Sequence, residues 1–225
     1  MVSDRIGEIL ENIEKDSDIC GTGEKVKVIA VTKFRSIEDM KKIASLGLTT
    51  FGENRIQEFN SKYENFGDEI KWHIIGSLQK NKLRYIIGKV EMIQSVDSLE
   101  LAGAVDDMSS KRGVKSDILL EFNISGEQTK HGLTEQNADE VISAISGLKN
   151  IRLKGIMMMA PNVDDENYLQ ELFAHTRSFY ESLLSYNGIS DNIDIDTISM
   201  GMSHDYRLAV RNGSNMVRLG TILFS

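Results

Sequence analysis

Apolar residues occur along this chain in short continuous runs that alternate with segments of helical spacing. Near the start, five apolar residues recur at helical intervals and predict an amphipathic helix: Val2, Ile6, Ile9, Leu10 and Ile13. The first continuous run follows in "VKVIAVTK", where residues 28–31 are all apolar, as expected for a strand buried on both faces. This run ends at Lys33, so a buried strand delivers an ammonium group at its carboxyl end.

Seven further segments repeat the alternation. Strands are predicted at residues 48–54, 70–77, 90–98, 117–125, 153–160, 195–201 and 215–224. Helices are predicted between them at 36–47, 56–66, 83–87, 99–111, from 134, 169–183 and 203–213. Ser36 and Asp39 make a capping-box signature at the start of the first of these helices.

The order of these elements predicts the fold class. Alternating strands and helices with short loops imply parallel strands joined by crossover helices. Eight such units predict an α/β fold, a closed (β/α)8 barrel of the TIM type, for which about 250 residues is typical. An open doubly wound sheet is the alternative. No helix is predicted after the last strand, so we expect the N-terminal helix to cover that gap in the outer ring.

The composition narrows the class of protein. With 225 residues, 40% of them hydrophobic, the chain can bury one sizeable core, and we expect residues 1–225 to form a single domain. The formal net charge of -8, without a Lys/Arg-rich block, argues against nucleic acid and membrane partners. The one cysteine, Cys20, cannot form an internal disulfide, which favours a cytoplasmic location. No apolar run approaches the roughly 20 residues that span a bilayer.

Reactive groups in a barrel of this type gather at the carboxyl ends of the strands. The predicted ends carry mostly polar and small residues: Lys33, Glu53, Asn54, Gly76, Ser77, Asp97, Ser98, Asn123, Ala160, Pro161, Ser199 to Ser203, Gly220 and Thr221. Polar residues also end strands for structural reasons alone. We expect Asp97 and Thr134 to be helix caps, and Glu53 to be a charge at a helix start rather than a catalytic acid.

Lys33 has two interpretations. A lysine at a strand end often extends its ammonium group to water while its aliphatic stem packs on apolar neighbours. In a partly dry pocket, however, the neutral amine is favoured, and a neutral amine can form a Schiff base with an aldehyde.

A second candidate cluster lies at the last two predicted strands. "ISMGMSHDY" runs from a strand through Gly201 into a helix that Ser203 can cap, and "VRLGT" places Arg218, Gly220 and Thr221 at the next strand end. Loops after strands seven and eight, with a short helix N-terminus, form the recurring phosphate site of these barrels. Free backbone N–H groups bind the anion, and glycine permits close approach. Each segment alone is consistent with a structural turn, but together they favour phosphate binding.

The remaining motifs do not indicate a further site. "GTGEK" precedes a strand instead of opening a helix, so a dinucleotide fingerprint is rejected. The four histidines and Cys20 lack metal-ligand spacing, so no metal site is expected. Met157, Met158 and Met159 are expected to fill the barrel and its mouth.

A nucleophilic lysine on strand one and a phosphate site after strands seven and eight suggest pyridoxal 5'-phosphate as the cofactor. The chain resembles the pyridoxal phosphate homeostasis protein family (the YggS/PROSC type). The matching segments lie in order along nearly the whole chain: "VIAVTK", "FGENRIQE", "WHIIGSLQKNK", "IQSVDS", "GEQTKHGL", "GIMMMAP", "SMGMSHDY" and "VRLGTILF". "FGEN", "WHxIGxLQxNK" and "SMGMSxD" together are highly specific.

The resemblance implies a barrel like the N-terminal domain of alanine racemase, with the cofactor held as a Schiff base. The residues that it assigns to the cofactor are Lys33 at the aldehyde, Asn54 near the ring, Arg218 at the pyridine nitrogen, and Ser199, Met200, Gly201, Gly220 and Thr221 around the phosphate. The chain departs from the family pattern twice. His131 stands where relatives often have a small residue, and relatives usually continue for a few residues beyond Ser225.

The expected function is that of a carrier. An arginine keeps its proton in a protein, so at the pyridine nitrogen it disfavours the protonated ring and weakens the electron sink. We therefore expect a non-catalytic protein that stores, delivers or buffers the cofactor, as a monomer or weak dimer, with apo pyridoxal-phosphate enzymes as candidate recipients. The alternatives are an amino-acid racemase that uses Lys33 as one base, and a Schiff-base aldolase acting on a phosphorylated substrate.

Overall fold

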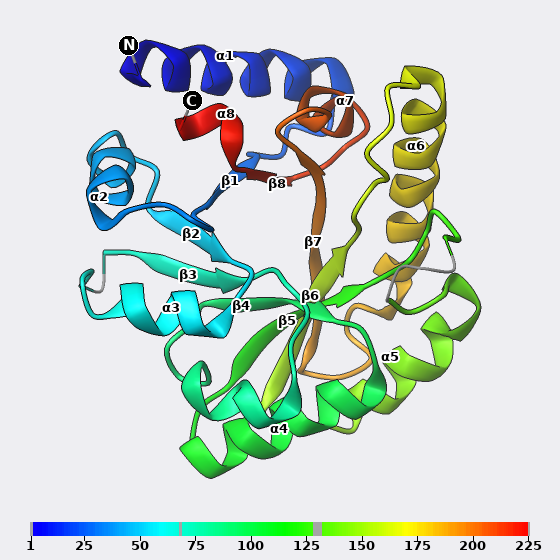
Figure 1. Ribbon diagram of the computed structural model, residues 1–225. Coiled ribbons are helices and arrows are strands. Elements are labelled where there is room, and N and C mark those ends of the chain that lie inside the picture. The colour runs from blue at the N-terminus through cyan, green and yellow to red at the C-terminus, as the bar shows by residue number, and fades with distance from the viewer. Residues whose placement is uncertain (1, 68, 128–131, 225) are drawn as a thin grey trace.

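The computed structural model of this chain describes residues 2–67, 69–127 and 132–224. Eight parallel strands form a closed barrel, in which each strand pairs with the next in sequence and the last pairs with the first. Figure 1 shows the strands at the centre of the molecule with the helices around them. The predicted (β/α)8 barrel is therefore confirmed, and the open doubly wound sheet is excluded.

The strands are shorter than several of the predicted segments. They are β1 Lys27–Val31, β2 Thr50–Glu53, β3 Lys71–Ile74, β4 Met92–Val96, β5 Ser116–Glu121, β6 Ile151–Met157, β7 Ile193–Met202 and β8 Met216–Leu219. β5 begins one residue before the predicted segment 117–125 and ends four residues before that segment ends. β6 begins two residues before the predicted segment 153–160 and ends three residues before that segment ends.

Helices follow the strands as the alternation predicts. They are α1 Val2–Cys20, α2 Ile37–Ser45, α3 Ile56–Tyr63, α4 Leu99–Arg112, α5 Ala138–Ser146, α6 Glu166–Leu183, α7 Tyr206–Arg211 and α8 Thr221–Phe224, with 3-10 helices η1 Lys80–Tyr85, η2 Glu135–Asn137 and η3 Leu184–Tyr186. The predicted cap is confirmed, because the Ser36 hydroxyl accepts a hydrogen bond from the Asp39 backbone N–H at the start of α2.

Side chains alternate along each strand between the barrel interior and the layer beneath the helices. On β1, Val28 and Ala30 belong to the large cluster between strands and helices, whereas Ile29 belongs to a small separate cluster. That small cluster takes one residue from each of five strands and forms the apolar part of the interior: Ile29, Met92, Leu119, Met157 and Met216. Of the three consecutive methionines, Met157 therefore fills the barrel, while Met159 is 39% exposed.

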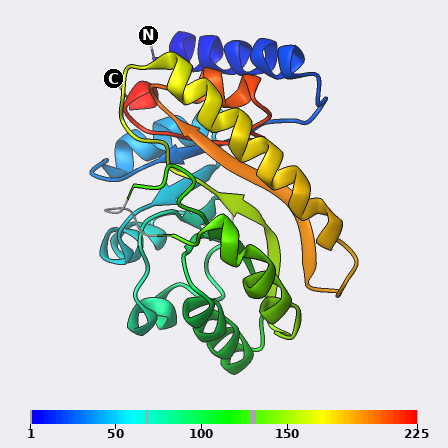
Figure 2. The same ribbon diagram turned by 90° about the vertical axis from the view of Figure 1, so that its right-hand side faces the viewer.

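The end of the chain differs from the prediction. The segment 215–224 is not one strand, since β8 ends at Leu219 and the one-turn helix α8 begins at Thr221. The backbone N–H of Leu223 donates to the carbonyl of Gly220, so the chain turns where an apolar run suggested extension. The N-terminal helix α1 does cover this side of the barrel, where it lies across α7 and α8 (Figures 1 and 2).

A buried ion-pair cluster fixes α1 to α7. The carboxylate of Asp16 is fully buried and pairs with the guanidinium groups of Arg207 and Arg211, each at 2.7 Å. These pairs hold the pKa of Asp16 below its usual value, although burial opposes the shift more strongly than any single pair favours it. Among the described residues, no helix is both long and apolar enough to cross a membrane.

Candidate functional site

Lys33 lies directly after β1, at the carboxyl end of the barrel. Strand alternation places it on the same side as Ile29, which belongs to the interior cluster, and Val31. Its side chain is exposed, and within residues 2–67, 69–127 and 132–224 it has no hydrogen bond or ion pair. Val31 lies 3.6 Å from the position that a Cβ atom would take on Gly220, so the ends of β1 and β8 meet here. Lys33 is therefore an uncommitted amine at the barrel mouth.

The backbone on both sides of Lys33 is held by a buried ion-pair cluster of Lys62, Glu53 and Glu58. The ammonium group of Lys62, on α3, donates to the carbonyl of Thr32 at 2.7 Å and to the Glu53 carboxylate at 2.7 Å. It also pairs with Glu58 at 3.1 Å, and Glu58 accepts from the backbone N–H of Phe34 at 2.8 Å. One lysine thus connects groups that immediately precede and follow Lys33.

The turn at Lys33 is also conformationally unusual. Phe34 has a φ of 61°, and it is the one described non-glycine residue with positive φ. This left-handed conformation is unfavourable for a bulky side chain and persists only where the surroundings impose it. The bond from the Phe34 N–H to Glu58 is one such constraint. The geometry around Lys33 is therefore imposed by its neighbours rather than by local preference.

Glu53 was predicted to be a charge at a helix start, and this prediction is wrong. Its carboxylate is fully buried at the end of β2, where it accepts from the Lys62 ammonium group and from the Thr32 hydroxyl at 2.6 Å. Burial raises the pKa of Glu53, while the hydrogen bonds from Lys62 and Thr32 oppose the rise. The sequence did not reveal Lys62, because a lysine in an amphipathic helix usually faces solvent.

Arg218 lies inside the barrel on β8, and its side chain is almost fully buried. Its guanidinium donates to the Ser199 carbonyl at 2.9 Å, to the Ser199 hydroxyl at 2.6 Å and to the Met158 carbonyl at 2.8 Å. Burial lowers the pKa of Arg218 to about 10, so the side chain still carries its charge at neutral pH. Within the described parts of the chain, no carboxylate lies within ion-pair distance of this cation.

Ser199 and Met200, which the resemblance assigned to the phosphate, form hydrogen bonds with other residues of the protein. The Ser199 hydroxyl is fully buried, donates to the Gln94 side-chain oxygen at 2.7 Å and accepts from Arg218. The Met200 backbone N–H and carbonyl both bond the Ser214 hydroxyl, at 3.4 and 2.7 Å. Neither residue offers a free donor at the strand end, because both lie below the rim of the barrel.

The phosphate segments nevertheless meet as expected. The Ser203 hydroxyl, predicted to cap a helix, instead accepts from the backbone N–H of Gly220 at 3.0 Å, so it joins the ends of β7 and β8. Gly201 has a φ of 95°, and a Cβ atom there would lie 2.6 Å from the Ala209 Cβ, so only glycine allows α7 to pack on β7. Thr221 is exposed at the first position of α8. Ser203 is thus a further polar group beside the expected phosphate position.

The rim carries two more groups of note. The Asn54 side-chain oxygen, just after β2, is buried and has no hydrogen-bond partner among the residues that the structure describes. Burial and the negative charge of Asp97 raise the pKa of Glu121, at the end of β5, to about 7, and Arg218 opposes this. Sequence reasoning missed Glu121, although an acidic residue inside the predicted strand 117–125 was the available signal.

The expected caps have mixed outcomes. Ser98, not Asp97, caps α4, because its hydroxyl accepts from the Leu101 N–H, while Asp97 accepts from the Ser98 hydroxyl. Thr134 is confirmed at the start of η2, where its N–H donates to the Asn137 side chain at 3.1 Å. His131 and Ser225, where the chain departs from the family pattern, lie outside the described residues.

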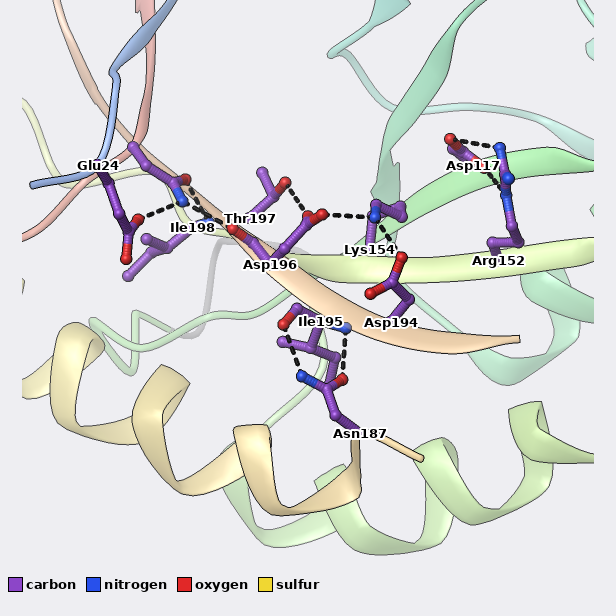
Figure 3. Close-up of polar contacts among 11 residues, drawn as sticks. Glu24, Asp117, Arg152, Lys154, Asn187, Asp194, Ile195, Asp196, Thr197 and Ile198 are labelled. Atoms are coloured by element: carbon purple, nitrogen blue, oxygen red, sulfur yellow. Dashed lines mark hydrogen bonds and ion pairs between the residues drawn. The ribbon is translucent and has the colours of Figure 1, made fainter. Parts of the chain in front are cut away.

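The N-terminal end of the barrel also carries charged side chains, but these form ion pairs. Figure 3 shows Lys154 of β6 between two carboxylates of β7, those of Asp194 at 2.7 Å and Asp196 at 2.5 Å. Arg152 makes a two-bond contact with Asp117 of β5, at 2.6 and 3.0 Å. Asp117, Arg152, Asp194 and Asp196 lie in the N-terminal halves of their strands, and Lys154 is the central residue of β6.

A third pairing at this end surrounds Glu91, just before β4. Its carboxylate lies 2.9 Å from the Lys71 ammonium, 3.7 Å from that of Lys27 and 2.9 Å from the His73 ring. The hydrogen bond from His73, followed by that from Lys71, lowers the pKa of Glu91 to about 2 against the effect of burial. Glu91 is therefore ionised throughout the physiological pH range.

Comparison with known proteins yields a family and its structures. The model of the alanine racemase N-terminal domain matches residues 5–225. The pyridoxal phosphate homeostasis protein of Aquifex aeolicus (strain VF5) is 34% identical, over 98% of this chain and 96% of that protein.

Two solved structures place the fold in context. PipY of Synechococcus elongatus PCC7942, solved with PLP bound, superimposes with a TM-score of 0.86 at 28% identity over the full length of both chains. The alanine racemase of Clostridium difficile 630 shares only the fold, with a TM-score of 0.71 at 18% identity, and the match covers 95% of this chain but 58% of the racemase.

Proposed function

We propose that this chain, which belongs to the alanine racemase N-terminal domain family and within it to the pyridoxal phosphate homeostasis proteins, binds pyridoxal 5'-phosphate and acts in the homeostasis of that cofactor. The observation that carries the proposal is Lys33, an amine at the barrel mouth that has no partner among the described residues and whose flanking backbone groups are held by Lys62 and Glu58.

The residues at the mouth fit this cofactor. When bound, pyridoxal 5'-phosphate would supply an aldehyde, and Lys33 would be the amine that holds it. The Asn54 oxygen is a buried acceptor that lacks a donor within the described parts of the chain, and Arg218 offers a fixed positive charge for the ring nitrogen. A lysine, a partnerless acceptor and a buried cation thus lie at the ends of β1, β2 and β8.

The phosphate end rests on the junction of β7 and β8. We assign the anion to the main chain around Gly201, Gly220 and Thr221, with the Ser203 and Thr221 hydroxyl groups beside it. Glycines at these positions leave the backbone N–H groups accessible to an anion. Ser199 and Met200 are not included, because their polar groups bond Gln94, Arg218 and Ser214.

A carrier role is favoured over catalysis. The charge of Arg218 disfavours a proton on the ring nitrogen, and this weakens the electron sink that racemisation needs. The wider proposal is that residues 1–225 act as one domain that stores, delivers or buffers the cofactor in the cytoplasm and passes it to apo pyridoxal-phosphate enzymes. Figure 1 is consistent with one domain, because all eight strands share one barrel.

The test is chemical trapping followed by transfer. Borohydride reduction of the loaded protein should fix the cofactor to the peptide that contains Lys33, as identified by mass spectrometry. The loaded protein should also activate an apo pyridoxal-phosphate enzyme, and it should not racemise alanine faster than free cofactor does. Labelling of another lysine would refute the assignment. Racemisation at ordinary enzyme rates without transfer would replace the carrier function by that of a racemase.

A further inference from the structure

A continuous line of hydrogen-bonded side chains crosses the barrel interior from its N-terminal end to Arg218. The bonds run from Glu91 to the His73 ring at 2.9 Å, from His73 to Gln94 at 2.8 Å, from Gln94 to Ser199 at 2.7 Å and from Ser199 to Arg218 at 2.6 Å. Four strands contribute, because His73 lies on β3, Gln94 on β4, Ser199 on β7 and Arg218 on β8. The barrel itself closes through backbone pairing of β1 with β8, to which this line of side chains does not belong.

The direction of every bond in this line is determined. The ionised Glu91 carboxylate can only accept, so the His73 Nε2 carries the hydrogen and Nδ1 accepts from the Gln94 amide nitrogen. The Gln94 oxygen then accepts from the Ser199 hydroxyl, and the Ser199 oxygen accepts from the Arg218 guanidinium. One tautomer and one amide orientation therefore satisfy the whole line, with an anion at one end and a cation at the other.

The line lies in a protected environment. His73, Gln94 and Ser199 are fully buried, and Arg218 is 3% exposed. The charged groups that face its ends are Lys27 and Lys71 at Glu91, and Glu121 and Asp205 near Arg218. Burial lowers the pKa of His73, which keeps the ring neutral as the line requires. A missing member would leave buried polar partners unsatisfied, which is costly.

We propose that His73, Gln94 and Ser199 are positioning residues that hold Arg218 in the orientation in which it meets the pyridine ring of the cofactor, with Glu91 fixing the direction of the line. This inference rests on the proposed function for its ligand. It removes Ser199 from the phosphate site and assigns it to the ring end. Ser199 then acts on pyridoxal and on pyridoxal 5'-phosphate alike, because the two ligands share the ring.

The test compares the two ligands in matched variants. Ser199→Ala and Gln94→Leu should weaken pyridoxal and pyridoxal 5'-phosphate by the same factor, about tenfold, as expected for a lost charge-assisted bond. The control is Ser109→Ala, which removes a buried hydroxyl whose partner Ser116 lies outside this line; its affinities should not change. A loss for pyridoxal 5'-phosphate alone would make Ser199 a phosphate ligand. Unchanged affinity for both ligands in both variants would show that these side chains fill the barrel interior without positioning Arg218 for the ligand.

A second measurement needs no cofactor. Nitrogen-15 NMR of the His73 ring in the unloaded chain should show only the Nε2–H tautomer at neutral pH. In Gln94→Leu the Arg218 side-chain N–H signals should lose their protection from exchange, while in Ser109→Ala they should keep it. A mixed tautomer, or unchanged Arg218 signals, would overturn the positioning role. If the wild type bound neither ligand, the proposed function would fail, and this measurement would still decide whether the line holds Arg218.

Discussion

At the N-terminal end of the barrel, Lys71 and Lys154 lie within 3 Å of carboxylates, whereas at the C-terminal end Lys33 and Arg218 have none at that distance within the described residues. Lys71 lies on β3, Lys154 on β6 and Arg218 on β8, while Lys33 follows β1. The N-terminal end is therefore neutralised within the protein, while the C-terminal end retains groups that a ligand can neutralise.

The comparison indicates which end of the barrel lowers the stability of the fold in order to bind a ligand. Exposed ion pairs contribute about 0–1 kcal/mol each, so those at the N-terminal end stabilise the fold only modestly. Among the described residues, Arg218 is a buried cation with no carboxylate at ion-pair distance, and the Asn54 oxygen is a buried acceptor with no donor. Both lower the stability of the unloaded protein. Such groups persist in active sites and binding sites because the ligand completes them.

The largest contrast is expected between Lys33→Ala and Lys71→Ala, two exposed lysines at opposite ends. Lys33→Ala should abolish the visible absorption band of the bound cofactor, because it removes the amine assigned to the aldehyde, whereas Lys71→Ala should retain it. The free energy of unfolding should change by about 0.5 kcal/mol or less in Lys33→Ala, since its side chain has no described partner. An absorption band that survives in Lys33→Ala would contradict the assignment of the cofactor to the amine of Lys33.

The next contrast is between two paired lysines. Lys62→Met leaves Glu53 and Glu58 without their cation in a buried site, and we expect a loss of roughly 3–5 kcal/mol in urea denaturation. Lys154→Met leaves two carboxylates that are more than half exposed, so its loss should be about 1 kcal/mol or less. Equal losses would show that the support beneath Lys33 is no stronger than an ordinary surface pair.

A smaller effect is expected at the phosphate junction. Thr221→Val removes a hydroxyl at the first position of α8 and should weaken pyridoxal 5'-phosphate by roughly 1.5–3 kcal/mol, which is about tenfold or more. Unphosphorylated pyridoxal should bind almost as well as to the wild type, as measured by absorbance titration. Equal weakening of both ligands would place Thr221 outside the phosphate site.

The smallest effect is in the pH dependence of stability, where Glu91 and Glu121 should act with opposite signs. The pKa of Glu121 is raised to about 7, so the folded state binds the extra proton, and stability should fall as pH rises from about 4.5 through 7. The pKa of Glu91 is lowered to about 2, so its contribution is present above about 4.5 and is lost as pH falls towards 2.

Variants separate the two contributions. Glu121→Gln should remove roughly 1–2 kcal/mol of the decline between pH 5 and 8, and Glu91→Gln should leave that range unchanged while altering the acid limb. Urea denaturation at a series of pH values measures both. A wild-type slope between pH 5 and 8 that persists in Glu121→Gln would contradict the shifted pKa of that residue.

The barrel could be predicted from the sequence because eight apolar runs alternate with helical spacing, and each run is long enough to be distinguished from a turn. The run at 215–224 could not be divided, since a short apolar segment after Gly220 is compatible with either a strand or a helix. The structure resolves this by turning the backbone at Gly220, so that Leu223 is buried in a helical turn.

Within the site, Lys33 and Arg218 could be identified because each stands out against an apolar strand. Ser199 could be found but not assigned, because the register of β7 against β8 shifts between Ser199 and Met202, and an irregularity of that kind has no sequence signature. Lys62 and Gln94 could not be found at all. Their roles depend on contacts between elements that are far apart in the sequence, and those contacts exist only once the barrel closes.

The ion pair between Asp16 on α1 and Arg207 on α7 has a consequence for synthesis on the ribosome. These residues are 191 positions apart, and β1 likewise completes its pairing only with β8. At about 5–20 residues per second, the apolar face of α1 remains without its native partner for about 10–40 s while the rest of the chain is made. The first helix to emerge therefore completes its packing among the last, and until then its isoleucines are available to chaperones or to other nascent chains.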